Sequence, residues 1–137
     1  GYTASNGAYR LQVNSQIFAT SSTIATSDGR YKENVEPITG ALNIVRALNP
    51  VSFNWKQHPV HNFDLEHKTV GFIAQEVQTA LSDKPYVAAI IKQNECELPD
   101  GAKEEFLGIA EGNMIAILTA AIKELKAEFD AYKSSHP

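Results

Sequence analysis

Cysteine, surplus positive charge and long apolar runs are all scarce in this sequence, and each scarcity excludes a class of protein. Cys96 is the only cysteine, so no disulfide can form within one chain, and we expect a free thiol in a polar loop. Asp and Glu outnumber Lys and Arg by 16 to 12, and this net charge of −4 argues against nucleic acid as a partner. No apolar run approaches the roughly 20 residues that span a bilayer, so we expect no membrane partner.

The composition is otherwise that of a folded protein. Of the 137 residues, 43% are hydrophobic and 20% are charged, which suits one moderate core. A chain of this length forms one domain or one domain with a short appendage.

Residues 1–26 differ from the rest of the chain, because Arg10 is their only charged residue and small polar residues dominate. Apolar residues alternate with polar ones here, which is typical of a β-strand with one covered face. These residues are Leu11, Val13, Ile17 and Ala19. So few large apolar groups cannot form a core alone, which favours a strand completed by neighbouring chains. A disordered linker is the alternative.

The pattern from residue 37 to residue 109 predicts a small body of short helices and strands. One helix starts between Pro37 and Thr39 and stops at Asn49-Pro50, because the residue before proline disfavours the helical region. A second helix is expected over 74–81. Strands are expected over 51–55, 69–73, 86–91 and 106–109, with a polar loop over 94–103 that contains a Pro-Asp-Gly turn.

From residue 112 to residue 133, apolar side chains recur in steps of three and four, which predicts one long helix. The spacing matches a heptad seam, with Ile115, Ile122 and Phe129 at one position and Leu118, Leu125 and Tyr132 at the other. A helix packed on a globular core shows similar spacing. Isoleucine followed by leucine in a seam nominally favours two strands over three.

Residues 26–34 place a hydroxyl nucleophile, Ser27, five positions before Lys32. A neutral lysine can take the proton of a serine. With Asp28-Gly29 as a two-residue hairpin turn, Ser27 and Lys32 become diagonal neighbours about 7–8 Å apart. Lysine ordinarily has a pKa of about 10.4, so burial or a nearby cation such as Arg30 is needed to make it neutral. Ser-Asp-Gly is also an ordinary turn sequence, so the spacing permits a dyad without requiring one.

Five sequence blocks follow one another in a fixed order. They are Ser27-Asp28-x-Arg30-x-Lys32-x-Asn34-Val35-x-Pro37-Ile38, then Ala41-Leu42 with Val45 and Leu48, then Pro50 with Phe53-x-Trp55, then Val70-Gly71-Phe72-Ile73-Ala74-Gln75-Glu76-Val77-Gln78, and last Ala120-Ala121-Ile122-Lys123-Glu124-Leu125. Together, they resemble the intramolecular chaperone domain of phage tailspikes, tail fibres and neck appendages, the S74 peptidase family. The resemblance runs from Ser27 to about Lys133, and several blocks in one order are more specific than any single block.

The resemblance implies an α+β fold with a small mixed body, short strands and a long C-terminal helix that forms a trimeric coiled coil. Residues 1–26 would be the end of the mature fibre, a β-rich intertwined trimer. Residues 27–137 would be the chaperone, with 112–133 as its trimerisation helix. The implied partners are two further copies of the chain and the fibre portion of the same chain. The protein would be made in the infected bacterial cytoplasm; its fibre portion would join the virion tail or appendage, and its chaperone portion would be released.

The resemblance also implies one self-cleavage. Ser27 would attack the carbonyl of Thr26 with Lys32 as the base, which cuts the Thr26–Ser27 bond. The residues that would support the catalytic pair lie in the turn and just after it. They are Asp28, Gly29, Arg30 and Asn34. Two alternatives stay open: a permanent trimeric tip that binds a receptor and never cleaves, and a membrane-bound transcription factor of the myelin regulatory factor type.

His58 and His61 have a spacing that can ligate a metal ion. No third ligand follows at a fitting spacing, and histidines are common in polar loops. The sequence therefore predicts neither a metal site nor a cofactor.

Overall fold

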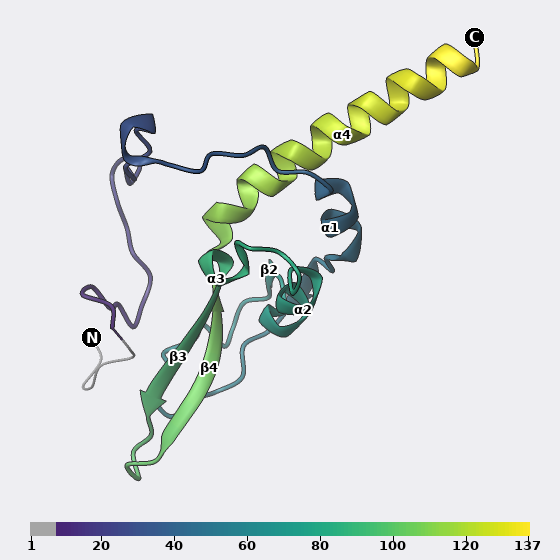
Figure 1. The fold of residues 1–137 in the computed structure, drawn as a ribbon. Helices are drawn as coiled ribbons and strands as arrows, with labels where there is room; N and C mark the ends of the chain where they lie inside the picture. The colour runs from purple at the N-terminus through teal and green to yellow at the C-terminus, as the bar shows by residue number, and fades with distance from the viewer. Residues whose placement is uncertain (1–7) are drawn as a thin grey trace.

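The computed structural model describes residues 8–137, and it combines helices with short antiparallel strands (Figure 1). In chain order, its elements are the 3-10 turn η1 (Gly29–Tyr31), α1 (Ala41–Ala47), β1 (Val51–Phe53), β2 (Thr69–Gly71), α2 (Ala74–Ala80), α3 (Val87–Ile90), β3 (Ile91–Glu97), β4 (Lys103–Ile109), the 3-10 turn η2 (Glu111–Asn113) and α4 (Met114–Ser135). The predicted α+β class is confirmed.

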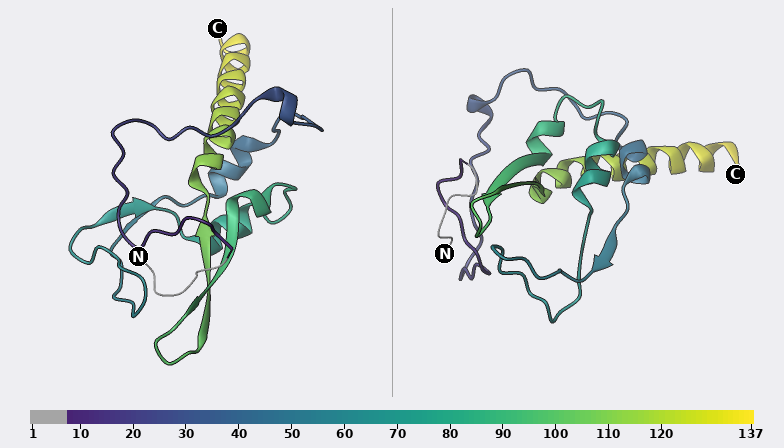
Figure 2. Two further views of the ribbon diagram at one scale, coloured as in Figure 1. Left: turned by 90° about the vertical axis from the view of Figure 1, so that its left-hand side faces the viewer. Right: turned by 90° about the horizontal axis from the view of Figure 1, so that it is seen from below.

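The strands form two separate two-stranded antiparallel sheets, β1–β2 and β3–β4. In the β3–β4 hairpin, Cys96 lies directly opposite Glu104. The three views show this hairpin and α4 projecting from the small body in opposite directions (Figures 1 and 2). The extended segment that carries η1 lies outside the body.

The core lies where α1 and α2 meet the first half of α4 and the junction between α3 and β3. Its buried side chains are Ala41, Ile44, Val77, Leu81, Ile90, Ile91, Met114, Ile117 and Ala121. Burial of these apolar groups supplies the main driving force for folding.

Helix α1 begins later than the sequence pattern predicts, at Ala41. Gly40 has a φ of 67°, a left-handed conformation that glycine adopts without strain and that separates α1 from the extended chain before it. The carboxylate of Glu124 on α4 accepts hydrogen bonds from the backbone N–H groups of Ala41 (3.1 Å) and Leu42 (2.7 Å). A side chain from α4 therefore caps α1, because Gly40 has no side chain to do so.

The strand predicted over 86–91 is wrong for most of its length. Residues 87–90 form helix α3, and β3 begins only at Ile91. Ile90 and Ile91 are both buried. In a straight strand, consecutive side chains point to opposite faces, so the short helical turn is what brings both side chains into one core. A run of four apolar residues does not separate these two structures by periodicity alone.

The polar loop predicted over 94–103 is also wrong in part. β3 continues to Glu97 and β4 starts at Lys103, so only residues 98–102 form the turn. Gly101 in this turn has a φ of 85°. The backbone N–H and C=O groups of β3 form hydrogen bonds with those of β4, so the hairpin is stable although polar side chains line it. Cys96 consequently lies in β3 with 1% of its surface exposed, not in a loop.

The other predicted elements are present with shorter bounds. β1 and β2 cover the first three residues of the strands predicted over 51–55 and 69–73, and α2 matches the predicted helix over 74–81 closely. The predicted return strand over 106–109 is the second half of β4.

The strand predicted in residues 1–26 is not found in its described part. Residues 8–26 contain no strand, and residues 1–7 lie outside the described residues. A strand needs a partner to pair its backbone groups, and this segment is not paired with β1–β4. It contacts the body through side chains: Tyr9 donates to Asn94 (2.8 Å), and Asn14 donates to the carbonyl of Val60 (2.9 Å).

Helix α4 spans 22 residues and carries two apolar faces. Met114, Ile117 and Ala121 pack into the core, whereas the residues of the predicted seam point away from it. Within residues 8–137, no helix combines the length and the apolar character required to cross a bilayer. The trimeric coiled coil stays a prediction, because the structure describes one chain.

Candidate functional site

The turn η1 shapes the site around Ser27. Asp28 precedes the turn, and its carboxylate accepts a hydrogen bond from the backbone N–H of Arg30 at 2.9 Å. The N–H groups of Tyr31 and Lys32 donate to the carbonyls of Asp28 (3.1 Å) and Gly29 (3.2 Å). An aspartate that bonds the amide two residues ahead favours a tight local turn. The predicted two-residue hairpin is therefore wrong, because the carboxylate of Asp28 stabilises a 3-10 turn and no paired strands flank it.

This turn brings Ser27 and Lys32 into direct contact. Lys32 Nζ donates a hydrogen bond to Ser27 Oγ at 2.7 Å. A nucleophile and a base within about 2.6–3.2 Å have the separation that proton transfer requires. Both side chains are exposed in the single chain.

Arg30, the cation predicted to lie near Lys32, is paired with Asp28. Its guanidinium forms a forked contact with the carboxylate of Asp28, with Nη2 2.8 Å from Oδ2 and Nε 3.2 Å from both carboxylate oxygens. This contact lowers the pKa of Asp28 and raises that of Arg30. The two charges largely cancel, so Arg30 has little net field left to act on the lysine.

Asn34 lies after the turn with a φ of 52°. Asparagine tolerates this left-handed conformation better than most residues. Among the hydrogen bonds of residues 8–137, none joins Asn34 to Ser27 or Lys32. Its observed contribution is to redirect the backbone between η1 and α1.

The six predicted seam residues are the large exposed apolar residues of α4. Their exposed fractions are 65% for Ile115, 40% for Leu118, 67% for Ile122, 54% for Leu125, 54% for Phe129 and 58% for Tyr132. Packing of α4 on the core therefore does not account for the heptad pattern, since a different face of the helix covers the core. A continuous exposed apolar stripe of this kind is typical of a protein interface.

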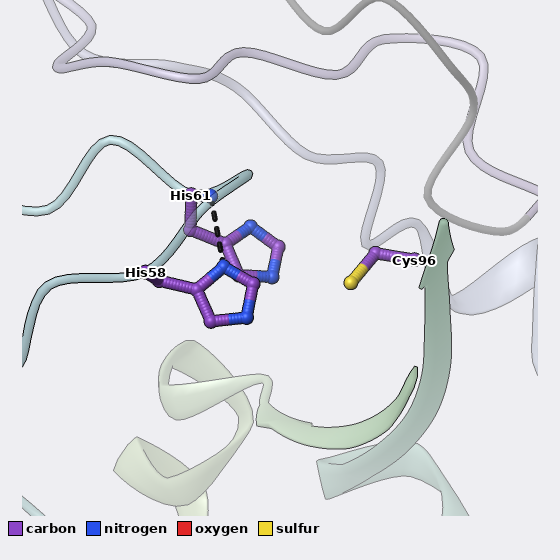
Figure 3. Close-up of side chains that lie close together, drawn as sticks. All are labelled: His58, His61 and Cys96. Carbon is purple, nitrogen blue, oxygen red and sulfur yellow. Dashed lines mark hydrogen bonds between the residues drawn. The ribbon is translucent and has the colours of Figure 1, made fainter. Parts of the chain in front are cut away.

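A second cluster lies on the other side of the body, where the loop between β1 and β2 meets the β3–β4 hairpin. The imidazole rings of His58 and His61 stack with their centroids 4.6 Å apart. Cys96 Sγ faces them across a gap, as Figure 3 shows. One candidate ligand atom from each of the three residues lies within 4.8 Å of the other two.

Sequence reasoning missed Cys96 as a neighbour of the histidine pair. Cys96 is distant in the sequence, and its polar neighbours predict a loop, whereas pairing of β3 with β4 places it in a strand. Burial of Cys96 raises the pKa of its thiol, and partial burial lowers the pKa of His61. Both shifts favour the uncharged forms of these groups.

The fold and the first site together define a small α+β domain with a serine–lysine pair at its N-terminal edge and an exposed apolar face on its last helix. Residues 27–84 match the family Peptidase_S74, described as chaperone of endosialidase. No match to a curated protein is found. This match agrees with the first part of the resemblance to the S74 family, and it begins at Ser27 itself.

Proposed function

We propose that this chain is the intramolecular chaperone of a phage tail fibre, tailspike or appendage protein. In this proposal, residues 27–137 drive three chains to associate and fold, and then separate from residues 1–26 by one self-cleavage. The observation that carries the cleavage step is the 2.7 Å contact between Lys32 Nζ and Ser27 Oγ. The family match, which starts at Ser27, supports the same boundary.

The proposed reaction is an acyl shift followed by hydrolysis. Neutral Lys32 takes the proton of Ser27 Oγ, and the oxygen attacks the carbonyl carbon of Thr26. The Thr26–Ser27 C–N bond breaks as the lysine returns the proton to the departing nitrogen of Ser27. Water then hydrolyses the ester, which leaves a carboxylate on Thr26 and restores the hydroxyl of Ser27.

The developing oxyanion needs hydrogen-bond donors. The N–H groups of Arg30, Tyr31 and Lys32 are used within the turn. This leaves the backbone amides of Asp28 and Gly29 as the donors that we propose. The hydrogen bond from the Arg30 N–H to the Asp28 carboxylate would hold the turn in shape, so Asp28 acts as a positioning residue.

Association of three chains is the proposed trigger for cleavage. In the single chain, Ser27 and Lys32 face solvent. Packing of neighbouring chains against this turn would remove water and favour the neutral amine. Cleavage would then report that assembly is complete.

The seam of α4 is the proposed contact between copies. Its exposed apolar residues need partners of the same kind, and copies of the same helix supply them by knobs-into-holes packing. We choose three copies over two because the resemblance implies trimeric fibres and because residues 8–26, the described part of the N-terminal segment, pair with no strand in the single chain. A local helical contact formed first would shorten the search for register in an intertwined fibre.

The test compares the intact chain with Ser27→Ala, Lys32→Ala and Lys32→Arg. Intact mass and N-terminal sequencing after assembly should show a fragment that begins at Ser27 for the wild type alone. Arginine should not rescue activity, because its guanidinium stays protonated. Lys68→Ala, which removes an exposed lysine away from the turn, is the matched control and should cleave like the wild type.

A wild-type chain that assembles and stays in one piece would overturn the cleavage step. The protein would then be the permanent trimeric tip of a fibre. Cleavage in Lys32→Ala at the wild-type rate would overturn the role of the lysine alone.

A further inference from the structure

The cluster of His58, His61 and Cys96 joins two segments that the proposed cleavage does not use. The histidines belong to the loop between β1 and β2, and the cysteine belongs to β3. The ring of His61 also contacts Phe106 on β4 edge-on, with centroids 5.0 Å apart. The cluster therefore lies between the loop and the hairpin, and nothing else in the proposed function requires its composition.

Glu104 adds an oxygen to the cluster. It lies opposite Cys96 in the β3–β4 register, and its Oε1 is 2.7 Å from His58 Nε2. Two imidazoles and one thiol thus form the cluster, and one carboxylate lies beside it at His58. We propose that His58, His61 and Cys96 bind a zinc ion, with Glu104 as the fourth ligand.

The composition points to zinc among the common metals. Zinc binds nitrogen and sulfur ligands together in tetrahedral sites, whereas magnesium and calcium require oxygen ligands. Zinc bonds of about 2.0–2.3 Å would hold neighbouring ligand atoms about 3.3–3.7 Å apart. The present spread of up to 4.8 Å requires the side chains to close by about 1 Å.

To bind the metal ion, the His58 ring must give up its present hydrogen bonds. Its Nδ1 now accepts from the backbone N–H groups of Val60 and His61, both at 3.1 Å, so Nε2 carries the proton and donates to Glu104. Coordination through Nε2 moves the ring proton to Nδ1, and the loop at Val60 shifts to release those two contacts. The carboxylate of Glu104, which loses its donor in the same step, already lies beside Nε2 and becomes free to bind the ion.

The ion can reach the site from solvent. His58, His61 and Glu104 line an open cavity of about 520 Å³ between the loop, the hairpin and the segment that contains Tyr9. Cys96 is almost fully buried. Binding releases the thiol proton, because the thiolate is the form that ligates metal.

The expected role of the ion is structural. Four protein ligands leave no open position for a substrate, which is typical of structural zinc. The ion would fasten the long loop between β1 and β2, which contains little regular structure, to the β3–β4 hairpin. The alternative is a buried cysteine thiol beside two histidines that binds no metal. The experiment below distinguishes this arrangement from a zinc site.

The test is a cobalt titration of the complete 137-residue chain, reduced and stripped of metal with a chelator. We expect one Co²⁺ per chain, a near-ultraviolet thiolate-to-cobalt charge-transfer band and the visible bands of a tetrahedral site, all removed by added Zn²⁺. Zn²⁺ should also raise the thermal midpoint, because an ion that binds the folded state stabilises it.

Cys96→Ser should abolish the charge-transfer band, and His61→Gln should weaken binding by at least about tenfold. His67→Gln is the matched control, because His67 pairs with Asp64 in the same loop, outside the cluster. A wild-type chain without the charge-transfer band, or with the same titration in Cys96→Ser, overturns the proposal. If circular dichroism shows that Cys96→Ser does not fold, the charge-transfer band of the wild type and the cobalt affinity of His61→Gln test the proposal. Neither result bears on cleavage at Thr26–Ser27.

Discussion

At the scale of single residues, Asp28 decides whether Ser27 and Lys32 meet. The sequence identifies both side chains, but not the turn between them. One carboxylate oxygen of Asp28 accepts from the N–H of Arg30, and the same group pairs with the guanidinium of Arg30. These two contacts have different effects. The hydrogen bond from the Arg30 N–H fixes the backbone of the turn, whereas the ion pair with the guanidinium neutralises charge.

Substitutions at Asp28 should separate the two contacts. Asp28→Asn keeps an acceptor for the Arg30 amide and removes the charge, so we expect cleavage near the wild-type rate. Asp28→Ala removes the acceptor and should slow cleavage by a factor on the order of ten, because the turn loses its cap. The fraction of cleaved chain over time on a denaturing gel measures both. Equal rates for the alanine and asparagine variants would show that the cap does not position the dyad.

At the scale of elements, Glu124 joins α1 to α4. Its carboxylate accepts from two backbone N–H groups at the start of α1, and these hydrogen bonds lower the pKa of Glu124 below its ordinary value of 4.5. The orientation also places a negative charge at the N-terminal end of the helix dipole. Since Gly40 provides no cap, the position of α1 depends on a residue far along the chain.

Replacement of Glu124 by glutamine should lower the thermal midpoint at neutral pH by several degrees, because a neutral amide accepts more weakly than a carboxylate. The folded-state pKa is lowered, so this stabilisation is fully present above pH 4.5 and is lost as the pH falls through the folded value. Midpoints followed by circular dichroism should therefore converge with the wild type at acidic pH. Glu128→Gln, one turn further along α4, is the control and should shift the midpoint little at either pH. A difference for Glu124→Gln that persists unchanged at acidic pH would contradict this assignment.

At the scale of the whole molecule, α4 has one apolar face on the core and a second face open to solvent. The two faces lie side by side around the helix, with Ile117 on the first and Leu118 on the second. Figures 1 and 2 show the second half of α4 extending beyond the body, where other copies can surround it. The single chain therefore leaves one apolar face of α4 uncovered.

Leu118→Ser together with Leu125→Ser should give a monomer that folds and does not cleave. Both side chains are exposed in the single chain, so their replacement removes seam contacts and leaves the core intact. Sedimentation gives the oligomeric state, and intact mass gives the extent of cleavage. Ala116→Ser with Lys123→Ser, on the same turns but outside the seam, should assemble and cleave like the wild type. Cleavage by the seam variant at the wild-type rate as a monomer would separate the chemistry from assembly.

Local sequence patterns were enough to predict the α+β class, the resemblance to the S74 family, the long last helix and the apolar stripe along it. These follow from local periodicity, from turn residues such as Asn49-Pro50, and from blocks that occur in a fixed order. The sequence also identified Ser27 and Lys32 as a candidate nucleophile and base, because their side-chain types and their spacing suit proton transfer.

The residues that meet across the chain could not be predicted from the sequence, because these contacts depend on packing. Residues 87–90 became a helix, since packing rather than propensity places Ile90 and Ile91 in one core. Cys96 reached the histidine pair through the register of β3 with β4, and Glu124 capped α1 through the packing of α4. Such contacts join residues that are far apart in the sequence and depend on how the elements pack in three dimensions. Local sequence spacing does not predict that packing.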